Sequence, residues 1–317
     1  VCSSDLTTKM PKKPYSLIFS AMLNMSIINK LLHSTFVSCL WVNSAFCTLN
    51  EPHQQIEDYR ILVNSMDWLS CLNSFRTSNP NIESLRLLDI GCGTGRWLKA
   101  FQNKLKDKLN VIIECDLLDP SQLALQEAAS TLNSPLFLEK LVKETVQNAE
   151  LEPSYYDIIW GMHSFYSIPK TELPNILEKC IYSLKEHGNL FIGLTSNKSF
   201  YNLFYDLFRS FYSINEIESY TSAEMIIEAF HSLGLEVELV KVEYLEKIPI
   251  EDIPRLNHYL LNECVGYSFD RDDNIASTLI LKDILNHPKI GAFLKSFIVN
   301  DQYEFPQEIW LIKWLKT

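Results

Sequence analysis

Short apolar runs alternate with amphipathic stretches through the middle of the chain, and this alternation predicts strands and helices in turn. The apolar runs are short and nearly continuous, which is typical of strands buried on both faces of a sheet. The expected strands cover 85–90, 111–118, 136–142, 156–162 and 189–194, and the expected helices cover 54–75, 96–105, 121–132 and 171–185. Strands that alternate with helices in this way predict a doubly wound, mostly parallel α/β sheet.

The pattern becomes more helical after Ser196. The expected elements are helices at 199–212 and 222–233, a strand at 235–245, two or three helices within about 250–299, and a final strand at 307–315. The helices at about 250–299 would then form an insertion before the last strand. No internal repeat or low-complexity tract divides the chain, so residues 51–317 are expected to form a single domain.

Residues 1–50 form a leader whose status stays open. Residues 1–6 match a translated sequencing adapter and are interpreted as an artefact. The candidate starts are Met10, Met22 and Met25. Residues 14–49 are apolar but interrupted by polar side chains, which argues against a membrane span. Two interpretations of them remain, a signal or anchor segment and helices that pack on or cover a site.

A glycine run after the first strand is the most informative motif. Glycines occupy alternate positions at Gly91, Gly93 and Gly95, and a helical pattern follows at once. A strand, a glycine turn and a helix form one side of a nucleoside-cofactor cradle, because a missing Cβ lets a ligand approach the backbone. A dinucleotide fingerprint would place its third glycine at position 96, where the chain has Arg96. A tight turn without any ligand is the alternative interpretation.

Carboxylates precede the glycine run and follow the next strand. Asp89, just before the loop, suits a cationic ligand better than a pyrophosphate. Asp119 ends the second strand, where a carboxylate can accept hydrogen bonds from both ribose hydroxyls. Glu114 and Asp116 are its rivals but sit earlier in the strand, and a simple helix cap is the structural alternative for Asp119.

The acid-x-Gly-x-Gly-x-Gly motif at 89–95 closely resembles the first motif of the class I S-adenosylmethionine-dependent methyltransferases. This resemblance implies a Rossmann-like sheet with an antiparallel last strand and S-adenosylmethionine as methyl donor. It further implies that Gly91, Gly93 and Gly95 hold the amino-acid part of the cofactor, with Asp89 acting on its ammonium group.

The end of the fourth strand, Trp160–Tyr166, carries the candidate chemistry. In an open α/β sheet the ligand lies beyond the carboxyl ends of the strands. His163 offers a base near neutral pH, and Tyr166 an aromatic face, so these two are the candidate catalytic residues. Met162 is expected to contact the cofactor, and Gly161 to let backbone and ligand come close. Trp160 is expected in the core, whereas Phe165 and Tyr166 could be core or pocket, and His163 could be structural.

A narrower resemblance links residues 54–317 to the histamine N-methyltransferase family. It rests on Asp119-Pro120-Ser121, Lys143-Glu144-Thr145, Tyr220-Thr221-Ser222 and Leu233-Gly234-Leu235. It implies that Thr145 lies close to an adenine contact and that His163 replaces a substrate-binding Gln. The generic Gly-Cys-Gly-Thr-Gly loop departs from that family, and no counterpart of its substrate-binding Asn is apparent. Methylation of a small amine or imidazole is therefore a safer expectation than histamine itself.

Composition restricts the partners. The net charge of -11 argues against a nucleic-acid surface, and the missing Asn/Asp-Pro-Pro-aromatic motif argues against a nucleic-acid amino-methyltransferase. The eight cysteines form no C-x-x-C pair or zinc-like cluster, so we expect free thiols, no metal and a cytoplasmic location.

Phe200 and Tyr201 are expected to pack in a helix, with cation stabilisation as the alternative. Glu57 and Asp58 could be lid carboxylates or lie on a solvated helix face.

The expectation is a monomeric methyltransferase that uses S-adenosylmethionine to methylate a small molecule, without nucleic-acid or membrane partners. Two alternatives remain. The first is an O- or C-methyltransferase, because the pocket residues do not fix the nucleophile. The second is a non-catalytic S-adenosylmethionine-binding protein.

Overall fold

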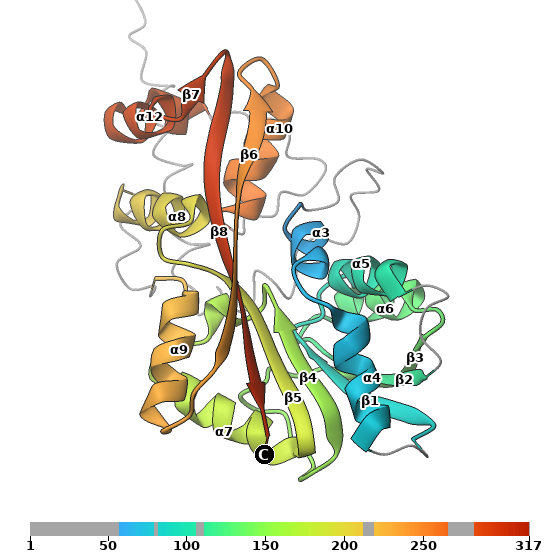
Figure 1. Cartoon of the computed structure of the whole chain (residues 1–317). Helices are drawn as coiled ribbons and strands as arrows, with labels where there is room; N and C mark the ends of the chain where they lie inside the picture. The colour runs from blue at the N-terminus through green and yellow to red at the C-terminus, as the bar shows by residue number, and fades with distance from the viewer. Residues whose placement is uncertain (1–56, 79–81, 106–110, 212–218, 266–281, 317) are drawn as a thin grey trace, which may run out of the picture.

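One mixed β-sheet forms the centre of the computed structural model, which describes residues 57–78, 82–105, 111–211, 219–265 and 282–316 (Figure 1). The strands are β1 (Ser84–Ile90), β2 (Ile112–Leu118), β3 (Leu136–Val142), β4 (Tyr156–Met162), β5 (Leu184–Thr195), β6 (Glu238–Pro249), β7 (Ile298–Val299) and β8 (Gln302–Leu315). Their order is β3-β2-β1-β4-β5-β8-β6, with β7 paired to β8. The first five strands are parallel and β8 runs antiparallel to β5 and β6, which confirms the predicted Rossmann-like fold.

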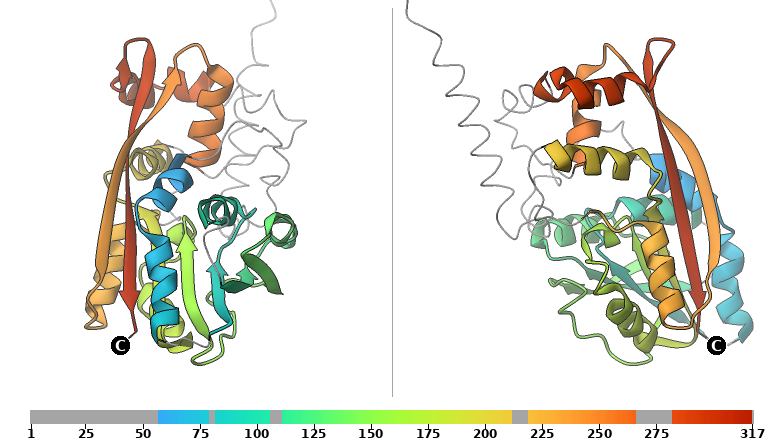
Figure 2. Two further views of the ribbon diagram at one scale, coloured as in Figure 1. Left: turned by 45° about the vertical axis from the view of Figure 1, so that its right-hand side comes forward. Right: turned by 90° about the vertical axis from the view of Figure 1, so that its left-hand side faces the viewer.

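Helices cover both faces of this sheet (Figures 1 and 2). One face carries α3 (Glu57–Asn64), α4 (Trp68–Ser78), α5 (Arg96–Leu105) and α6 (Gln122–Thr131), and the other carries α7 (Leu173–Ser183) and α9 (Ala223–Ser232). Trp160 lies at the centre of the first face, fully buried, with its ring 4.8 Å from that of Phe101 and 5.6 Å from that of Trp97. Aromatic side chains of this size dominate the area buried in a core, and Trp160 is a core residue as expected.

A separate aromatic core lies beyond the end of the parallel strands, where β6 and β8 continue as a long two-stranded ribbon (Figure 1). The helices α8 (Phe200–Phe211), α10 (Ile253–Asn257) and α12 (Pro288–Lys295), with the π-helical turn His258–Glu263, pack beside this ribbon. Phe200 and Phe305 stack with ring centroids 4.0 Å apart, and both are fully buried. We call this aromatic unit the upper lobe. Phe200 and Tyr201 are buried in it, as the helix-packing interpretation expected.

The predicted helix at 54–75 was wrong in one respect, because the described part is two helices, α3 and α4. The hydroxyl of Ser65 donates to the carbonyl of Leu62 at 2.8 Å and ends α3. Asp67 then accepts a hydrogen bond from the backbone N–H of Ser70 at 3.1 Å, as a capping residue does. The break lets α4 lie along the sheet while α3 reaches the strand ends.

Strand boundaries differ most in the second half of the sheet. β5 begins at Leu184, so the residues between the predicted helix at 171–185 and the predicted strand at 189–194 lie inside it. His187 adopts a left-handed φ of 64°, and the pairing with β4 shifts between Tyr156 and Ile158. β6 and β8 both extend further into the upper lobe than predicted, because they pair along their full length. The predicted elements at 96–105, 136–142 and 156–162 begin and end as expected.

None of the helices in the described ranges combines the length and the apolar character that a membrane span requires. The leader, residues 1–50, lies outside the described residues. The division into a leader and a single domain at 51–317 stays a prediction.

Candidate active site

The glycine loop joins β1 to α5 at the carboxyl end of β1, as the sequence predicted. Gly91, Gly93 and Gly95 all have left-handed φ angles, of 66°, 52° and 77°. A Cβ on Gly91 would lie 2.5 Å from Cβ of Ser164, and one on Gly95 would lie 2.9 Å from Cα of Ala128. A Cβ on Gly93 would meet no atom within 4 Å. Two of the glycines therefore permit close packing, and Gly93 faces open space that a ligand can fill.

Asp119 ties this loop to the end of β2. Its Oδ2 accepts the backbone N–H of Gly93 at 3.0 Å, and its Oδ1 accepts that of Ser121 at 2.8 Å. Ser121 itself caps α6 by accepting the N–H of Ala124 at 3.2 Å, so Asp119 is not the simple helix cap that was the alternative. Burial raises the pKa of Asp119, against the lowering by these two hydrogen bonds. A carboxylate has further lone pairs, so ribose hydroxyls can still donate to it.

The rivals of Asp119 have partners elsewhere. Asp116 accepts the hydroxyl of Tyr156 at 2.7 Å, and Glu114 pairs with Arg86 at 3.5 Å. Both lie on β2 itself rather than at its end. Of the three acids, only Asp119 bonds to the glycine loop in the described structure.

Asp89 is a buried carboxylate at the same edge of the sheet. It is 2% exposed, and its Oδ2 has no hydrogen-bond partner among the described residues. Burial raises the pKa of Asp89 to about 8, and the charge of Asp119 adds to this rise. An ionised carboxylate whose oxygen is buried without a hydrogen bond is costly unless a cation or donor joins it. The loop, the open space at Gly93 and this carboxylate therefore fit the ammonium-bearing end of S-adenosylmethionine.

His163 lies directly after β4, with its ring held between two polar side chains. Its Nδ1 is 2.7 Å from the hydroxyl oxygen of Tyr166, and its Nε2 is 3.6 Å from Oδ2 of Asp58. The backbone N–H of His163 donates to the carbonyl of Gly193 at 2.8 Å, which fixes it to β5. Its φ of 56° is left-handed, an uncommon conformation for a residue with a side chain and one that concentrates at functional sites.

Hydrogen bonding assigns the proton between Tyr166 and His163. The hydroxyl oxygen of Tyr166 accepts the backbone N–H of Thr195 at 3.4 Å, and burial raises the pKa of this phenol. The phenol therefore stays protonated and donates to Nδ1 of His163. A neutral ring that accepts at Nδ1 carries its proton at Nε2, on the side of Asp58.

Asp58 corrects the solvated-face interpretation. It is only 2% exposed, because α3 packs against α5 and the long strands β6 and β8 and turns this side chain inward. The neighbouring Tyr59 places its ring edge-on to that of His163, with centroids 5.4 Å apart. The sequence signal was an acid in the helix before the first strand, but periodicity could not say which side of that helix is buried.

Two further hydroxyls near His163 were not anticipated. Oγ of Ser164 and Oγ1 of Thr195 are buried and have no hydrogen-bond partner among the described residues. Ser164 follows His163, and Thr195 ends β5 beside Tyr166. Serine and threonine are too common at strand ends for sequence alone to single them out.

The structure also places four other residues that the sequence analysis singled out, namely Gly161, Phe165, Met162 and Thr145. A Cβ on Gly161 would lie 2.2 Å from the ring of Phe165, so this glycine admits a protein side chain rather than a ligand, which corrects the expected role. Phe165 is fully buried and belongs to the core. Met162 packs in the core, and Thr145 lies in the loop after β3 and donates its N–H to Glu144 at 2.9 Å. Their cofactor contacts stay predictions.

The described cysteines are free, and no cluster of His, Cys, Asp or Glu in the described part of the chain could hold a metal ion. The free cysteines there are Cys71, Cys92, Cys115, Cys180 and Cys264.

A Rossmann-like sheet with a glycine loop after β1 and carboxylates after β1 and β2 defines an α/β protein that binds a nucleoside cofactor. A model of the methyltransferase domain family matches residues 70–240, more than half of the chain. The chain therefore belongs to this family, with the class I S-adenosylmethionine-dependent architecture, and S-adenosylmethionine is its methyl donor.

Solved structures with similar folds have low sequence identity to the chain. The YcgJ protein from Bacillus subtilis is 14% identical and has a TM-score of 0.47, over 78% of this chain and 98% of that chain. The Haemonchus contortus phosphoethanolamine N-methyltransferase 2 is 16% identical, with a TM-score of 0.43, over 83% and 58%. A Thermotoga maritima methyltransferase described as a possible histamine N-methyltransferase is 15% identical, with a TM-score of 0.40, over 82% and 92%. No curated protein sequence matches the chain. Identities this low leave the methyl acceptor open.

Proposed function

We propose that the chain transfers the methyl group of S-adenosylmethionine to a nitrogen atom of a small amine or imidazole. The observation that carries this proposal is the buried array of Asp58, His163 and Tyr166 beside the glycine loop. Within it, a carboxylate faces an imidazole across 3.6 Å, with each side chain no more than 10% exposed. Such a site suits a small acceptor that carries a positive charge or an N–H group.

The cofactor-binding assignments rest on the loop geometry. We assign the amino-acid end of the cofactor to Asp89 and the glycine loop, and its ribose to Asp119. Gly91 and Gly95 position the loop, and Gly93 offers the open space that the ligand fills. Thr145 and Met162 are proposed as further contacts near the adenine and the methyl-bearing end.

When bound, the cofactor supplies a methyl group already activated by its sulfonium sulfur. The residues of the chain then have to orient the acceptor and exclude water. An amine attacks only when it is neutral, so it has to lose its proton first. Asp58 accepts that proton, because Nδ1 of His163 is occupied by Tyr166 and Nε2 already carries a proton, and His163 orients the carboxylate of Asp58. Tyr166 holds the imidazole ring in place through Nδ1.

The net charge of the chain supports a small-molecule acceptor rather than a nucleic acid. A net charge of -11 opposes binding to a polyanion such as nucleic acid. We propose that the protein acts as a monomer. Size-exclusion chromatography with light scattering tests the oligomeric state directly.

The experiment that tests the proposal measures methyl transfer from 13C-methyl S-adenosylmethionine to a panel of amines, imidazoles, phenols and carbon acids. NMR of the product identifies the atom that receives the methyl group. We expect products on nitrogen only. Methyl groups on oxygen or carbon would establish the alternative reaction, and cofactor binding without turnover of any acceptor would favour the non-catalytic alternative.

Matched variants separate catalysis from binding. We expect His163→Gln and Asp58→Asn to lower kcat by about 100-fold while changing cofactor affinity by less than about twofold. Asp119→Ala should instead weaken cofactor binding, because it removes the ribose contact and loosens Gly93. If His163→Gln lowered kcat and cofactor affinity equally, His163 would be a structural residue and the assignment would be wrong.

A further inference from the structure

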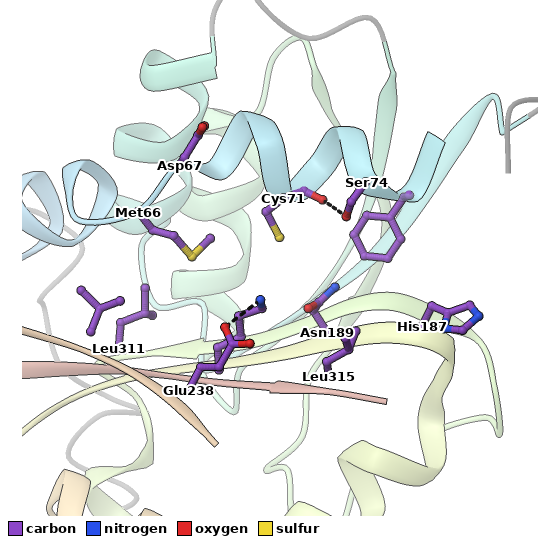
Figure 3. Close-up of a pocket in the computed structure, with 12 residues that line it drawn as sticks. Met66, Asp67, Cys71, Ser74, His187, Asn189, Glu238, Leu311 and Leu315 are labelled. Carbon is purple, nitrogen blue, oxygen red and sulfur yellow. Dashed lines mark hydrogen bonds and ion pairs between the residues drawn. The ribbon is translucent and has the colours of Figure 1, made fainter. Parts of the chain in front are cut away.

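A second pocket lies beneath α4, against the part of the sheet formed by β5, β6 and β8 (Figure 3). Its volume is about 530 Å³, which falls within the range of small-molecule sites in proteins. None of the residues assigned to cofactor or acceptor lines it. It is therefore separate from the candidate active site.

The walls of this pocket are mainly apolar. They are formed by Met66, Phe75, Val240, Leu311 and Leu315. Figure 3 shows the side chain of Met66 below α4, with Leu311 facing it from the sheet. Walls of this kind favour an apolar, compact ligand and provide little that would bind a strongly hydrated one.

Asn189 is the polar group that points to a ligand. It sits on β5, is only 4% exposed, and its carboxamide forms no hydrogen bond with any described residue. Its side chain points from the sheet toward α4, into the pocket (Figure 3). The carboxamide opens onto the pocket, where it presents a donor and an acceptor side by side to a ligand. A ligand group that matches both at once is another amide.

The charges around the pocket argue against an anionic ligand. Lys313 is already paired with Glu238 at 3.0 Å, on the directly opposite position of the neighbouring strand. Asp67 contributes a second carboxylate to the lining. Glu238 compensates the charge of Lys313, and Asp67 adds a further negative charge. A carboxylate or phosphate would therefore be repelled more than an uncharged ligand.

We propose that this pocket binds a small, neutral, planar molecule that carries a carboxamide or lactam group next to an apolar ring. Asn189 pairs with the amide edge, and the ring lies among Phe75, Met66 and Leu311. The pocket shares no residue with the proposed acceptor site, so this proposal stands or falls separately from the proposed function.

Nicotinamide is a suitable probe, because it is neutral and planar and carries a carboxamide on an aromatic ring. We expect its addition to full-length protein labelled with 15N-asparagine to shift the side-chain NH2 signal of Asn189 in a saturable way. The dissociation constant should be about a millimolar, as for a ligand of this size. Nicotinic acid, which has the same ring and a carboxylate, should bind at least about tenfold more weakly.

Two variants test the location, and a third is the control. Asn189→Leu removes the amide with little change in volume, and Leu315→Trp fills the pocket from a position that is 42% exposed and so tolerant of substitution. Each should weaken nicotinamide binding at least about tenfold. Asn103→Leu makes the first change at an exposed position of α5, outside the pocket, and should leave binding unchanged.

Three results would overturn the proposal. The first is a wild-type protein whose Asn189 signal does not respond to nicotinamide. The second is undiminished binding to folded Leu315→Trp protein, which would place the probe elsewhere. The third is a concentration-dependent dimer in sedimentation that Leu315→Trp abolishes, which would identify a second copy of the chain as the occupant.

Discussion

At the scale of single residues, the buried carboxylate of Asp89 connects stability to function. Burial raises the pKa of Asp89 to about 8 in the cofactor-free fold, so it is largely protonated at neutral pH. The unfolded chain ionises this group near its usual value of 3.8. Between these values the folded state binds the extra proton, so the contribution of Asp89 to stability falls as pH rises from 3.8 toward 8. In the proposed site, the cofactor's ammonium group would favour the ionised carboxylate and offset this cost.

The first prediction concerns this linkage. Affinity for S-adenosylhomocysteine, which has the same ammonium group, should rise up to about tenfold per pH unit from about pH 6 and level off above about 8. Calorimetry in two buffers of different ionisation enthalpy should detect proton release on binding below pH 8. An affinity independent of pH across this range would mean that Asp89 does not contact the ammonium group of the cofactor.

The variant Asp89→Asn gives the second prediction. It should raise the melting temperature of the cofactor-free protein at about pH 9, where wild-type Asp89 is ionised in a buried site, and it should weaken cofactor binding. Thermal denaturation with and without S-adenosylhomocysteine measures both effects. A lower melting temperature would mean that the ionised carboxylate stabilises the fold.

At the scale of elements, the turn from β1 to α5 divides its glycines between packing and ligand access. A Cβ on Gly95 meets the backbone of Ala128 in α6, whereas a Cβ on Gly93 meets nothing. Both have positive φ, so alanine strains the backbone at either position. Because the backbone strain is common to both substitutions, the difference between their effects reports whether the space beside each glycine is filled by protein or by ligand.

The third prediction compares these two glycines. Gly95→Ala should destabilise the protein by about 2–4 kcal/mol, because backbone strain and overpacking against α6 add together. Gly93→Ala should cost only about 1 kcal/mol but weaken S-adenosylhomocysteine binding at least about tenfold, because its methyl group enters the ligand space. Urea denaturation and calorimetry measure the two quantities. Full binding by Gly93→Ala would show that the cofactor does not use this space.

At the scale of the whole molecule, three hydrophobic cores among the described residues share the long strand β8, one on each face of the sheet and one in the upper lobe. β6 and β8 pair from Glu238↔Lys313 beside the parallel sheet to Pro249↔Gln302 in the upper lobe. The lower core packs around Trp160 and Phe101, and the upper lobe around Phe200 and Phe305. The lower core supports the glycine loop directly, since α5 begins where the loop ends.

The fourth prediction follows from this division. Phe305→Ala should cost about 3–5 kcal/mol and speed amide hydrogen exchange in α8 and α12 while cofactor binding persists. Phe101→Ala, an equal truncation, should speed exchange in α5 and the glycine loop and weaken cofactor binding. Hydrogen exchange with mass spectrometry distinguishes the two. Equal exchange throughout both variants would mean that the molecule has a single cooperative core.

The sequence by itself determined the parallel half of the sheet, the glycine loop and Asp119. These features depend on local signals, namely apolar runs, glycines at fixed spacing and an acid at a strand end, and neighbouring residues suffice to read them. It also selected His163 and Tyr166, because position at the end of β4 already places a residue near the ligand edge.

Only the tertiary structure decided the burial of Asp58, the break between α3 and α4, the role of Gly161 and the extent of β6 and β8. Asp58 and His163 are far apart in sequence, and their 3.6 Å approach depends on how α3 packs against α5, β6 and β8. Gly161 depends on where the ring of Phe165 packs. β6 and β8 extend because each satisfies the backbone of the other over its full length. Contacts between segments distant in sequence determine these features, and the local sequence pattern does not specify which distant side chains will be in contact.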